Sequence, residues 1–258
     1  MHYIRPPAEK TAGQNPFYLR KLCPYYRCIT IELGKKKYEA CLTYYNDPAK
    51  ISYGIILTHG AGGDMNHKQL VGIAEKLAKA GYLVLRFTCK GLNLAYRTKV
   101  FTGIVDYVKE NYPHLKGCFI GGRSMGSRAA VGVCCDSKMT DFLQGVICLS
   151  YPLHKPNDFK QLRDGPLNDV TKPVLFVSGT DDNMCDREMF LPVLDHMTKS
   201  QVHWIEGGNH GLEIKGKPIE DIVLEIELVI RTFIQECLTD KLKRTKVQKA
   251  VKKKIKTQ

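Results

Sequence analysis

A serine flanked by glycines is the first chemically suggestive feature of this 258-residue chain. The segment Gly122-Arg-Ser-Met-Gly126 follows an apolar run typical of a strand and precedes a run typical of a helix. A serine in such a sharp strand-to-helix turn needs nearly bare positions two residues before and after it, because side chains there would collide. The pattern predicts that Ser124 is a nucleophile. The alternative is a serine that only caps the helix.

Nucleophilic catalysis by a serine also needs a base, and a carboxylate that orients the base. The chain offers both, in the order nucleophile, acid, histidine. His210 lies in a glycine-rich segment after an apolar run, and we expect it to be the base. Asp181 and Asp182 follow another apolar run, which ends at Gly179. We expect Asp182 to be the acid, and the alternative is that the pair only caps the next helix.

A glycine-rich stretch after the apolar run 55–57 completes the set of groups that acyl transfer requires. Backbone amides in such a turn point into open space, and we expect those of Ala61 and Met125 to form an oxyanion hole. His59, in the same stretch, is expected to order its loop rather than to do chemistry. No spacing of Cys and His resembles a metal site, so neither a metal nor another cofactor is predicted.

The elements that must position these residues alternate between strand and helix patterns. Strands are predicted near 53–57, 83–87, 118–121, 146–150, 174–178 and 201–205. Helices are predicted near 68–80, 100–111, 125–135, 188–197 and 219–237. Two alternating runs, 27–33 and 37–44, precede them and predict a hairpin. Right-handed crossovers would bring the carboxyl ends of the parallel strands, and with them the candidate residues, to one edge of the sheet.

Four segments also resemble an α/β-hydrolase-like family that includes a subunit of the non-specific lethal histone acetyltransferase complex. They are Gly121-Gly-Arg-Ser-Met-Gly-Ser-Arg128, Leu85-Arg-Phe-Thr-Cys-Lys-Gly-Leu-Asn93, Ser150-Tyr-Pro-Leu-His154 and Leu175-Phe-Val-Ser-Gly179. The resemblance covers roughly residues 28–237 and implies an α/β-hydrolase fold with a triad of Ser124, Asp182 and His210. It implies no substrate, and a scaffold or interaction protein without catalysis is the alternative function.

The predicted architecture is a mostly parallel, twisted sheet with an N-terminal antiparallel hairpin and helices on both faces. The prolines and charges of residues 151–172 predict a minimal lid or none. An open site favours a small acyl or peptide-like substrate, and we expect Leu92, Tyr151 and Leu153 to contact it. The alternative is an acidic substrate, recruited by basic residues that otherwise form an ordinary solvated rim: Lys90, Arg97, Arg123 and Arg128.

Charge separates the chain into a body and a tail. We expect a domain at 28–237, between an N-terminal extension at 1–27 and a lysine-rich tail at 238–258. The net charge is +13, and residues 240–258 alone hold eight Lys, one Arg and one Asp. Apolar residues at four-residue intervals make the tail a candidate basic amphipathic helix for an acidic surface, nucleic acid or a protein partner. The alternatives are a nuclear import signal and a disordered, solubilising tail.

Composition also indicates a compartment. No run is apolar over the length that a membrane span needs, and the first residues lack a secretory signal. We therefore expect an intracellular protein without a transmembrane segment, in the cytoplasm or the nucleus. The ten cysteines are scattered among apolar segments and are expected to be reduced. Cys89 lies at a predicted strand end, where a reactive thiol is the alternative to a buried one.

Overall fold

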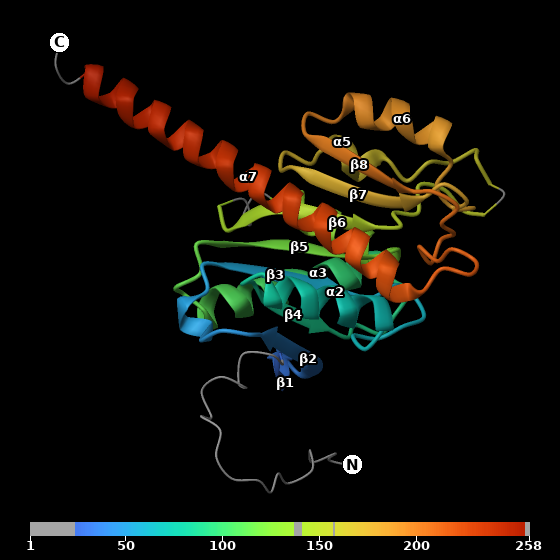
Figure 1. Ribbon diagram of the computed structural model, residues 1–258, viewed down its shortest axis with the longest axis horizontal. Coiled ribbons are helices and arrows are strands. Elements are labelled where there is room, and N and C mark those ends of the chain that lie inside the picture. The colour runs from blue at the N-terminus through green and yellow to red at the C-terminus, as the bar shows by residue number, and fades with distance from the viewer. Residues whose placement is uncertain (1–23, 137–140, 157, 256–258) are drawn as a thin grey trace, which may run out of the picture.

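The computed structural model describes residues 24–136, 141–156 and 158–255, with side chains as far as residue 240 (Figure 1). Most of the predicted N-terminal extension lies outside the described residues, and so do the side chains of most of the basic tail. Within the described ranges, no helix combines the length and the apolar character of a membrane span.

Strands and helices alternate along most of the chain. The strands are β1 (Tyr25–Leu33), β2 (Lys36–Tyr44), β3 (Tyr53–Thr58), β4 (Leu83–Phe87), β5 (Gly117–Arg123), β6 (Leu143–Leu149), β7 (Val174–Gly179) and β8 (Ser200–Ile205). The helices are α2 (Lys68–Lys79), α3 (Leu94–Asn111), α4 (Met125–Cys134), α5 (Gly165–Asn168), α6 (Arg187–His196) and α7 (Ile219–Ile255), with a 3-10 turn, η1, at Pro48–Lys50.

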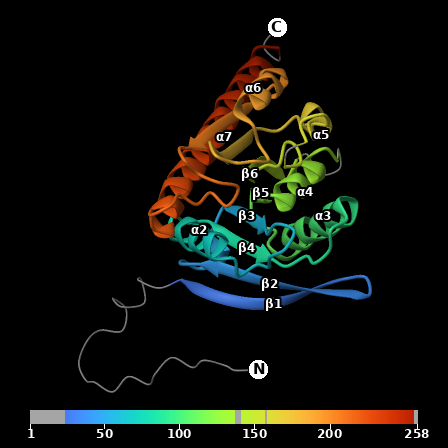
Figure 2. The ribbon, with the colours of Figure 1, turned by 90° about the vertical axis from the view of Figure 1, so that its right-hand side faces the viewer.

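The strands form one eight-stranded sheet in the order β1-β2-β4-β3-β5-β6-β7-β8. β1 pairs antiparallel with β2, and β2 pairs antiparallel with β4. All remaining neighbours pair in parallel. The hairpin β1-β2 lies along one edge of the sheet (Figure 2). The predicted mostly parallel sheet with an N-terminal antiparallel hairpin is confirmed.

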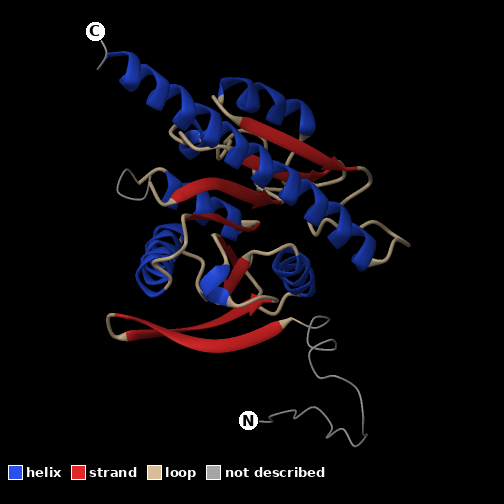
Figure 3. Cartoon of the chain, turned by 60° about the vertical axis from the view of Figure 1, so that its left-hand side comes forward, coloured by secondary structure: helices blue, strands red, loops and turns tan. Residues whose placement is uncertain are grey.

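Helices cover both faces of this sheet (Figure 2, Figure 3). On one face, α3, α4 and α6 enclose a core that includes Phe101, Phe176 and Phe190. On the other face, α2 and α7 enclose a core in which the rings of Phe119 and Phe233 meet edge to face at 6.1 Å. The central strands are therefore buried on both sides, which is why they appear in the sequence as continuous apolar runs.

The parallel pairing brings distant loops to one edge. β3, β5, β7 and β8 all run in the same direction, so their carboxyl ends lie together. The loops that follow these ends carry Ala61, Ser124, Asp182 and His210, respectively. The sheet therefore provides the shared edge that the sequence predicts.

Two helix boundaries differ from the predictions. α3 begins at Leu94 rather than near Val100, because the side chain of Asn93 accepts a hydrogen bond from the amide of Tyr96 at 2.8 Å and caps the helix. α7 continues as backbone to Ile255 instead of ending near residue 237. Its last turns extend beyond the sheet (Figure 1).

The connection between β6 and β7 carries little regular structure. Its described part holds one helix, the four-residue α5. It also folds back on itself, because Arg163 N donates to Leu153 O at 2.7 Å. A segment of this kind is too small to cover the edge of the sheet as a large lid. The predicted minimal lid agrees with this arrangement.

Candidate active site

Ser124 lies in the turn between β5 and α4, with φ 52° and ψ −117°. L-residues rarely adopt this backbone conformation, so the surrounding structure must impose it. A Cβ on Gly122 would lie 2.6 Å from Thr58 O, and one on Gly126 would lie 2.7 Å from His59 O. Only glycine fits at these positions. The side chain of Ser124 makes no capping hydrogen bond to α4, so the capping interpretation is wrong.

A chain of hydrogen bonds joins Ser124, His210 and Asp182. Ser124 Oγ lies 2.9 Å from His210 Nε2, and both carboxylate oxygens of Asp182 lie 2.9 Å from His210 Nδ1. The carboxylate can only accept, so Nδ1 carries the proton and Nε2 accepts from the serine hydroxyl. The side chain of Asp182 is fully buried, whereas that of His210 is 22% exposed. This arrangement can remove a proton from Ser124.

The structure distinguishes the two candidate acids. Asp181 is exposed, and its backbone amide donates to Gly208 O at 2.9 Å. Asp182 is buried, and its Oδ1 also accepts from the amide of Met184 at 2.8 Å. The helix that follows is capped by Asp186 and not by either candidate. Asp182 therefore makes the histidine contact that the sequence predicts for the acid.

Side chains from two other elements hold the loop that carries His210. Arg123 Nη2, at the end of β5, donates to His210 O at 3.2 Å. Gln69 Nε2, in the first turn of α2, donates to Gly211 O at 3.2 Å. Two consecutive carbonyls of the loop are thus fixed. Gln69 was not among the predicted site residues, because a polar residue in the apolar part of a helix was its only signal in the sequence.

The amides of Ala61 and Met125 are available as donors. Neither donates to an acceptor in the described part of the chain. Met125 is the first residue of α4, and the amide of a first helical residue has no partner within its helix. Gly60, which precedes Ala61, adjoins Ser124: a Cβ on Gly60 would lie 3.4 Å from Ser124 Cβ. Both expected oxyanion donors are therefore unengaged among the described residues, and one of them belongs to the residue that follows Ser124.

His59 and Arg97 hold the loop before Ala61 from the interior. His59 Nδ1 donates to Gly60 O at 2.6 Å, and its Nε2 accepts from Cys89 N at 3.0 Å. Burial, reinforced by the charge of Arg97, lowers the pKa of His59 and keeps the ring neutral near pH 7. Arg97 is only 2% exposed and donates to the carbonyls of His59, Gly60 and Gly91. His59 orders its loop, as the sequence predicts.

The interpretation of a basic rim is wrong for Arg97. Its place in the first turn of α3, which begins earlier than expected, directs the side chain inward. Arg123 and Arg128 are half-buried, and burial lowers the pKa of the Arg123 guanidinium. Lys90 is exposed. Cys89 is 2% exposed, and its burial raises the pKa of the thiol, so it is no reactive thiolate.

The three expected substrate contacts lie in different surroundings. Leu92 is 73% exposed. Tyr151 and Leu153 are fully buried in the core, and the Tyr151 hydroxyl donates to Arg163 O at 2.7 Å. These two side chains stabilise the connection after β6 and present no surface to a substrate in this conformation. The prediction for Tyr151 and Leu153 was wrong, because the connection after β6 packs these side chains into the core.

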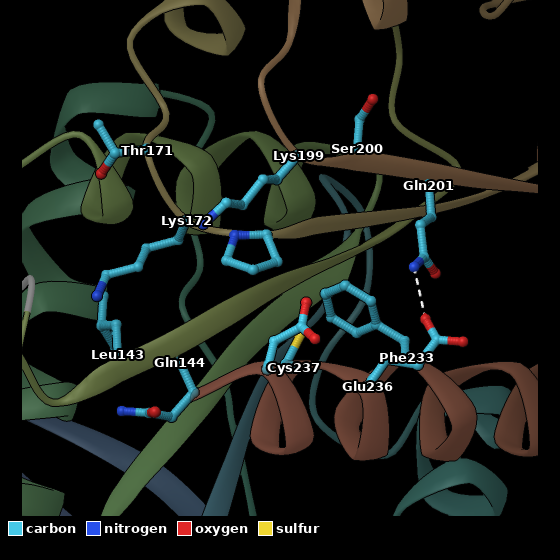
Figure 4. A pocket seen from close by; sticks show the side chains of 12 residues that line it. Leu143, Gln144, Thr171, Lys172, Lys199, Ser200, Gln201, Phe233, Glu236 and Cys237 are labelled. Atoms are coloured by element: carbon cyan, nitrogen blue, oxygen red, sulfur yellow. Dashed lines mark hydrogen bonds between the residues drawn. The ribbon is translucent and has the colours of Figure 1, made fainter. Parts of the chain in front are cut away.

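Two of the cavities in the described part of the chain lie at opposite ends of the sheet. One, of about 810 Å³, adjoins the loop after β3 and is lined by residues that include Gly62, Gly63, Gln69, Lys90 and Glu213. The other, of about 500 Å³, lies at the amino-terminal ends of β6, β7 and β8 against α7. There Gln201 Nε2 donates to Glu236 Oε2 at 2.6 Å (Figure 4). The second cavity is remote from Ser124. Within the described residues, no group of three His, Cys, Asp or Glu could hold a metal ion.

Comparison with known proteins agrees with this architecture. Residues 52–235 match the family described as alpha/beta hydrolase domain. The chain is similar to Est1E from Butyrivibrio proteoclasticus, with a TM-score of 0.67, 19% identity and coverage of 81% of this chain and 99% of that one. It is also similar to dienelactone hydrolase from Anabaena variabilis, with a TM-score of 0.67, 17% identity and coverage of 83% of this chain and 98% of that one. XC6422 from Xanthomonas campestris, described as a serine hydrolase without lid, is similar with a TM-score of 0.61 and 15% identity. That match covers 81% of this chain and 94% of XC6422.

Proposed function

This chain belongs to the alpha/beta hydrolase domain family, and we propose that it is a serine hydrolase that cleaves an ester, thioester or amide. The continuous hydrogen-bonded chain from Ser124 through His210 to Asp182 carries the proposal. Burying a carboxylate is costly unless it is paired. A scaffold without chemistry has no physical need for a buried carboxylate behind a histidine that reaches a strained serine.

The proposed acylation begins with Ser124 Oγ attacking the carbonyl carbon of the substrate. His210 Nε2 takes the hydroxyl proton as the new C–O bond forms, and the carbonyl π electrons move to oxygen. When the tetrahedral intermediate collapses, the bond to the leaving group breaks, and His210 returns the proton to that group. Water then attacks the acyl carbon while His210 Nε2 takes a proton from it. The bond to Ser124 Oγ breaks, His210 returns the proton to Oγ, and the acid product leaves.

Asp182 supports this cycle through the ring of His210. By accepting from Nδ1, it keeps Nε2 free to receive a proton, and it stabilises the imidazolium that forms. The amides of Ala61 and Met125 would meet the oxyanion. Such donors act strongly because they are already oriented when the charge develops. Each of the four groups thus has one task in the proposed reaction.

The architecture also favours a class of substrate. With only α5 and irregular chain between β6 and β7 in the described part of that connection, no large lid encloses the edge. The structurally similar proteins include esterases, although their low identity supports only the fold. We therefore propose small, accessible acyl or peptide-like substrates in preference to deeply enclosed lipids.

An interaction role is the second candidate. The four segments 85–93, 121–128, 150–154 and 175–179 together resemble testis-expressed protein 30, whose family also includes the subunit of the histone acetyltransferase complex named above. The observation that favours this role is the end of α7, which extends beyond the sheet and carries the lysine-rich segment (Figure 1). Partners with acidic surfaces, including nucleic acid, suit that charge. This role and catalysis are compatible.

Labelling with a fluorophosphonate tests the catalytic proposal directly. The reagent phosphonylates a serine only when a base activates it, so the wild-type protein should be labelled and peptide mapping should find the adduct on Ser124. Ser124→Ala should lose both the label and any hydrolysis of activated esters. Loss of the nucleophile in a triad costs up to about a millionfold in turnover.

Ser200→Ala is the matched control. Ser200 begins β8, at the opposite end of the sheet from the candidate site. This variant should be labelled at the wild-type rate. Folded wild-type protein that stays unlabelled, and that hydrolyses no activated ester, would contradict the proposal and leave the interaction role.

A further inference from the structure

Arg97 is a buried cation that donates hydrogen bonds to three backbone carbonyls. Its Nε donates to Gly91 O at 2.7 Å, its Nη1 to His59 O at 2.9 Å and its Nη2 to Gly60 O at 3.0 Å. No carboxylate lies within ion-pair distance of it among the described residues. Burial lowers the pKa of the guanidinium, which reflects the cost of removing the charge from water. Since burying this charge costs free energy, we ask what the hydrogen bonds of Arg97 hold in place.

The three acceptors belong to two loops at the candidate site. Gly91 lies in the loop after β4, whereas His59 and Gly60 lie in the loop after β3 that leads to Ala61. A guanidinium is planar and rigid, so two neighbouring donors define both the position and the orientation of the group they bind. Arg97 therefore fixes two consecutive carbonyls of one loop against the other loop.

Because a peptide group is planar, anchoring the carbonyl of Gly60 also fixes the direction of the Ala61 amide. The peptide between Gly60 and Ala61 is planar and trans, so its C=O and N–H point in opposite directions. Gly60 O points toward Arg97, and it also accepts from His59 Nδ1. The amide of Ala61 must point away from these donors. Rotating this peptide would break both hydrogen bonds to its carbonyl.

We propose that Arg97 is the positioning residue of the oxyanion hole: it holds the 60–61 peptide so that the Ala61 amide stays directed at the reacting carbonyl. This inference rests on the proposed serine hydrolase function. Arg97 itself touches no substrate in this role. A Cβ on Gly60 would lie 3.4 Å from Ser124 Cβ, so the residue that supplies the anchored carbonyl adjoins the serine.

Arg97→Met and Arg97→Lys test this role. Methionine keeps much of the length of the side chain but donates no hydrogen bond. Lysine keeps the charge but lacks the planar pair of N–H donors that the guanidinium presents. Loss of one oxyanion donor costs about 10²–10³-fold in kcat. We expect kcat for p-nitrophenyl acetate to fall about 100-fold in Arg97→Met and less in Arg97→Lys, with KM changed less than about threefold.

Two readouts separate positioning from general damage. A trifluoromethyl ketone forms a tetrahedral adduct, so its affinity should fall by the same factor as kcat/KM. The pH dependence of kcat/KM should not move, because the contact of His210 with Asp182 is untouched by the substitution. A variant that is merely unstable would show normal kinetics in its folded fraction.

Arg86→Met is the matched control. Arg86 is also buried, at 3% exposure, and also donates to a backbone carbonyl, Met65 O at 2.6 Å. None of its hydrogen bonds reaches residues 59–61. Its loss should lower the melting temperature while kcat and the affinity for the trifluoromethyl ketone stay near wild type.

The outcomes are decisive in each case. A folded Arg97→Met protein with wild-type kcat and inhibitor affinity overturns the inference. If neither Arg97 variant folds, a crystal structure of the wild-type protein phosphonylated at Ser124 decides: a phosphonyl oxygen about 3 Å from Ala61 N supports it, and one without that contact overturns it. A folded wild-type protein that is not labelled and hydrolyses no activated ester overturns the proposed function as well.

Discussion

Replacing Asp182 with Asn removes a charge from the candidate triad with little change in shape. Both carboxylate oxygens lie 2.9 Å from His210 Nδ1, and Oδ1 also accepts from Met184 N at 2.8 Å. An amide can keep the Met184 hydrogen bond only if its oxygen stays at the Oδ1 position. Its NH₂ group then takes the Oδ2 position and donates toward Nδ1. The ring proton therefore moves to Nε2, the atom that must accept from Ser124.

The expected loss follows from this change of tautomer. An Asp to Asn change of this kind in a serine triad lowers kcat by about 10⁴-fold, or about 5 kcal/mol of transition-state stabilisation. Because the Asp182 side chain is fully buried, water cannot easily replace the missing acceptor. Substrate binding should change little, since Asp182 faces the histidine rather than the substrate. The loss should thus appear in kcat and not in KM.

Asp181→Asn is the matched control, since it makes the same chemical change one residue away on an exposed side chain. Exposed substitutions change stability by about 0.5 kcal/mol or less, so kcat should stay within about threefold of wild type. The assay is hydrolysis of p-nitrophenyl acetate by both variants, with circular dichroism to establish folding. Equal losses in the two variants, or a larger loss in Asp181→Asn, would refute the assignment of the acid and the tautomer argument with it.

Gly122→Ala should lower the free energy of unfolding by about 1–3 kcal/mol in urea titrations, because its Cβ would meet the rigid backbone at 2.6 Å, whereas Gly165→Ala, with open space around it, should be neutral. A wild-type urea midpoint in Gly122→Ala would contradict this packing argument. Deleting residues 241–258 should change the melting temperature by less than about 3 °C but abolish salt-sensitive binding to duplex DNA; a drop of many degrees would show that the end of α7 packs as part of the fold. Burial lowers the pKa values of His59 and His67, so below about pH 6.5 the unfolded chain binds more protons than the folded one and stability should fall. Urea unfolding at pH 7.5 and 5.5 measures this loss, which His59→Gln should reduce; an unchanged loss would contradict the role of His59.

Much of the fold can be read from local patterns. A strand between two helical layers needs apolar residues on both faces, so the runs that became β3, β5 and β7 are visible without tertiary information. The turn at Ser124 is equally visible, because the two glycines around it answer a steric demand within a few residues. The position of Asp182 follows from the end of β7. Local sequence thus determined the fold class and located the candidate triad.

The contact between Gly179 and Gly208 is a feature that local sequence patterns do not predict. Gly179 reads as an ordinary strand-end glycine, yet a Cβ on it would lie 1.9 Å from Gly208 O. That contact joins the loop of Asp182 to the loop of His210. Because the two glycines are distant in sequence, their mutual requirement has no signature in either segment alone.

The environment of polar side chains was decided by tertiary structure alone. Arg97 looked like a rim charge, yet carbonyls from two other loops surround it. Gln69 carried no functional signal, and Tyr151 was expected to contact the substrate but lies in the core. A periodic pattern reports which face of an element is apolar, because that property repeats along the chain. Which carbonyl a buried guanidinium meets depends on how separate elements pack, and that information is not local.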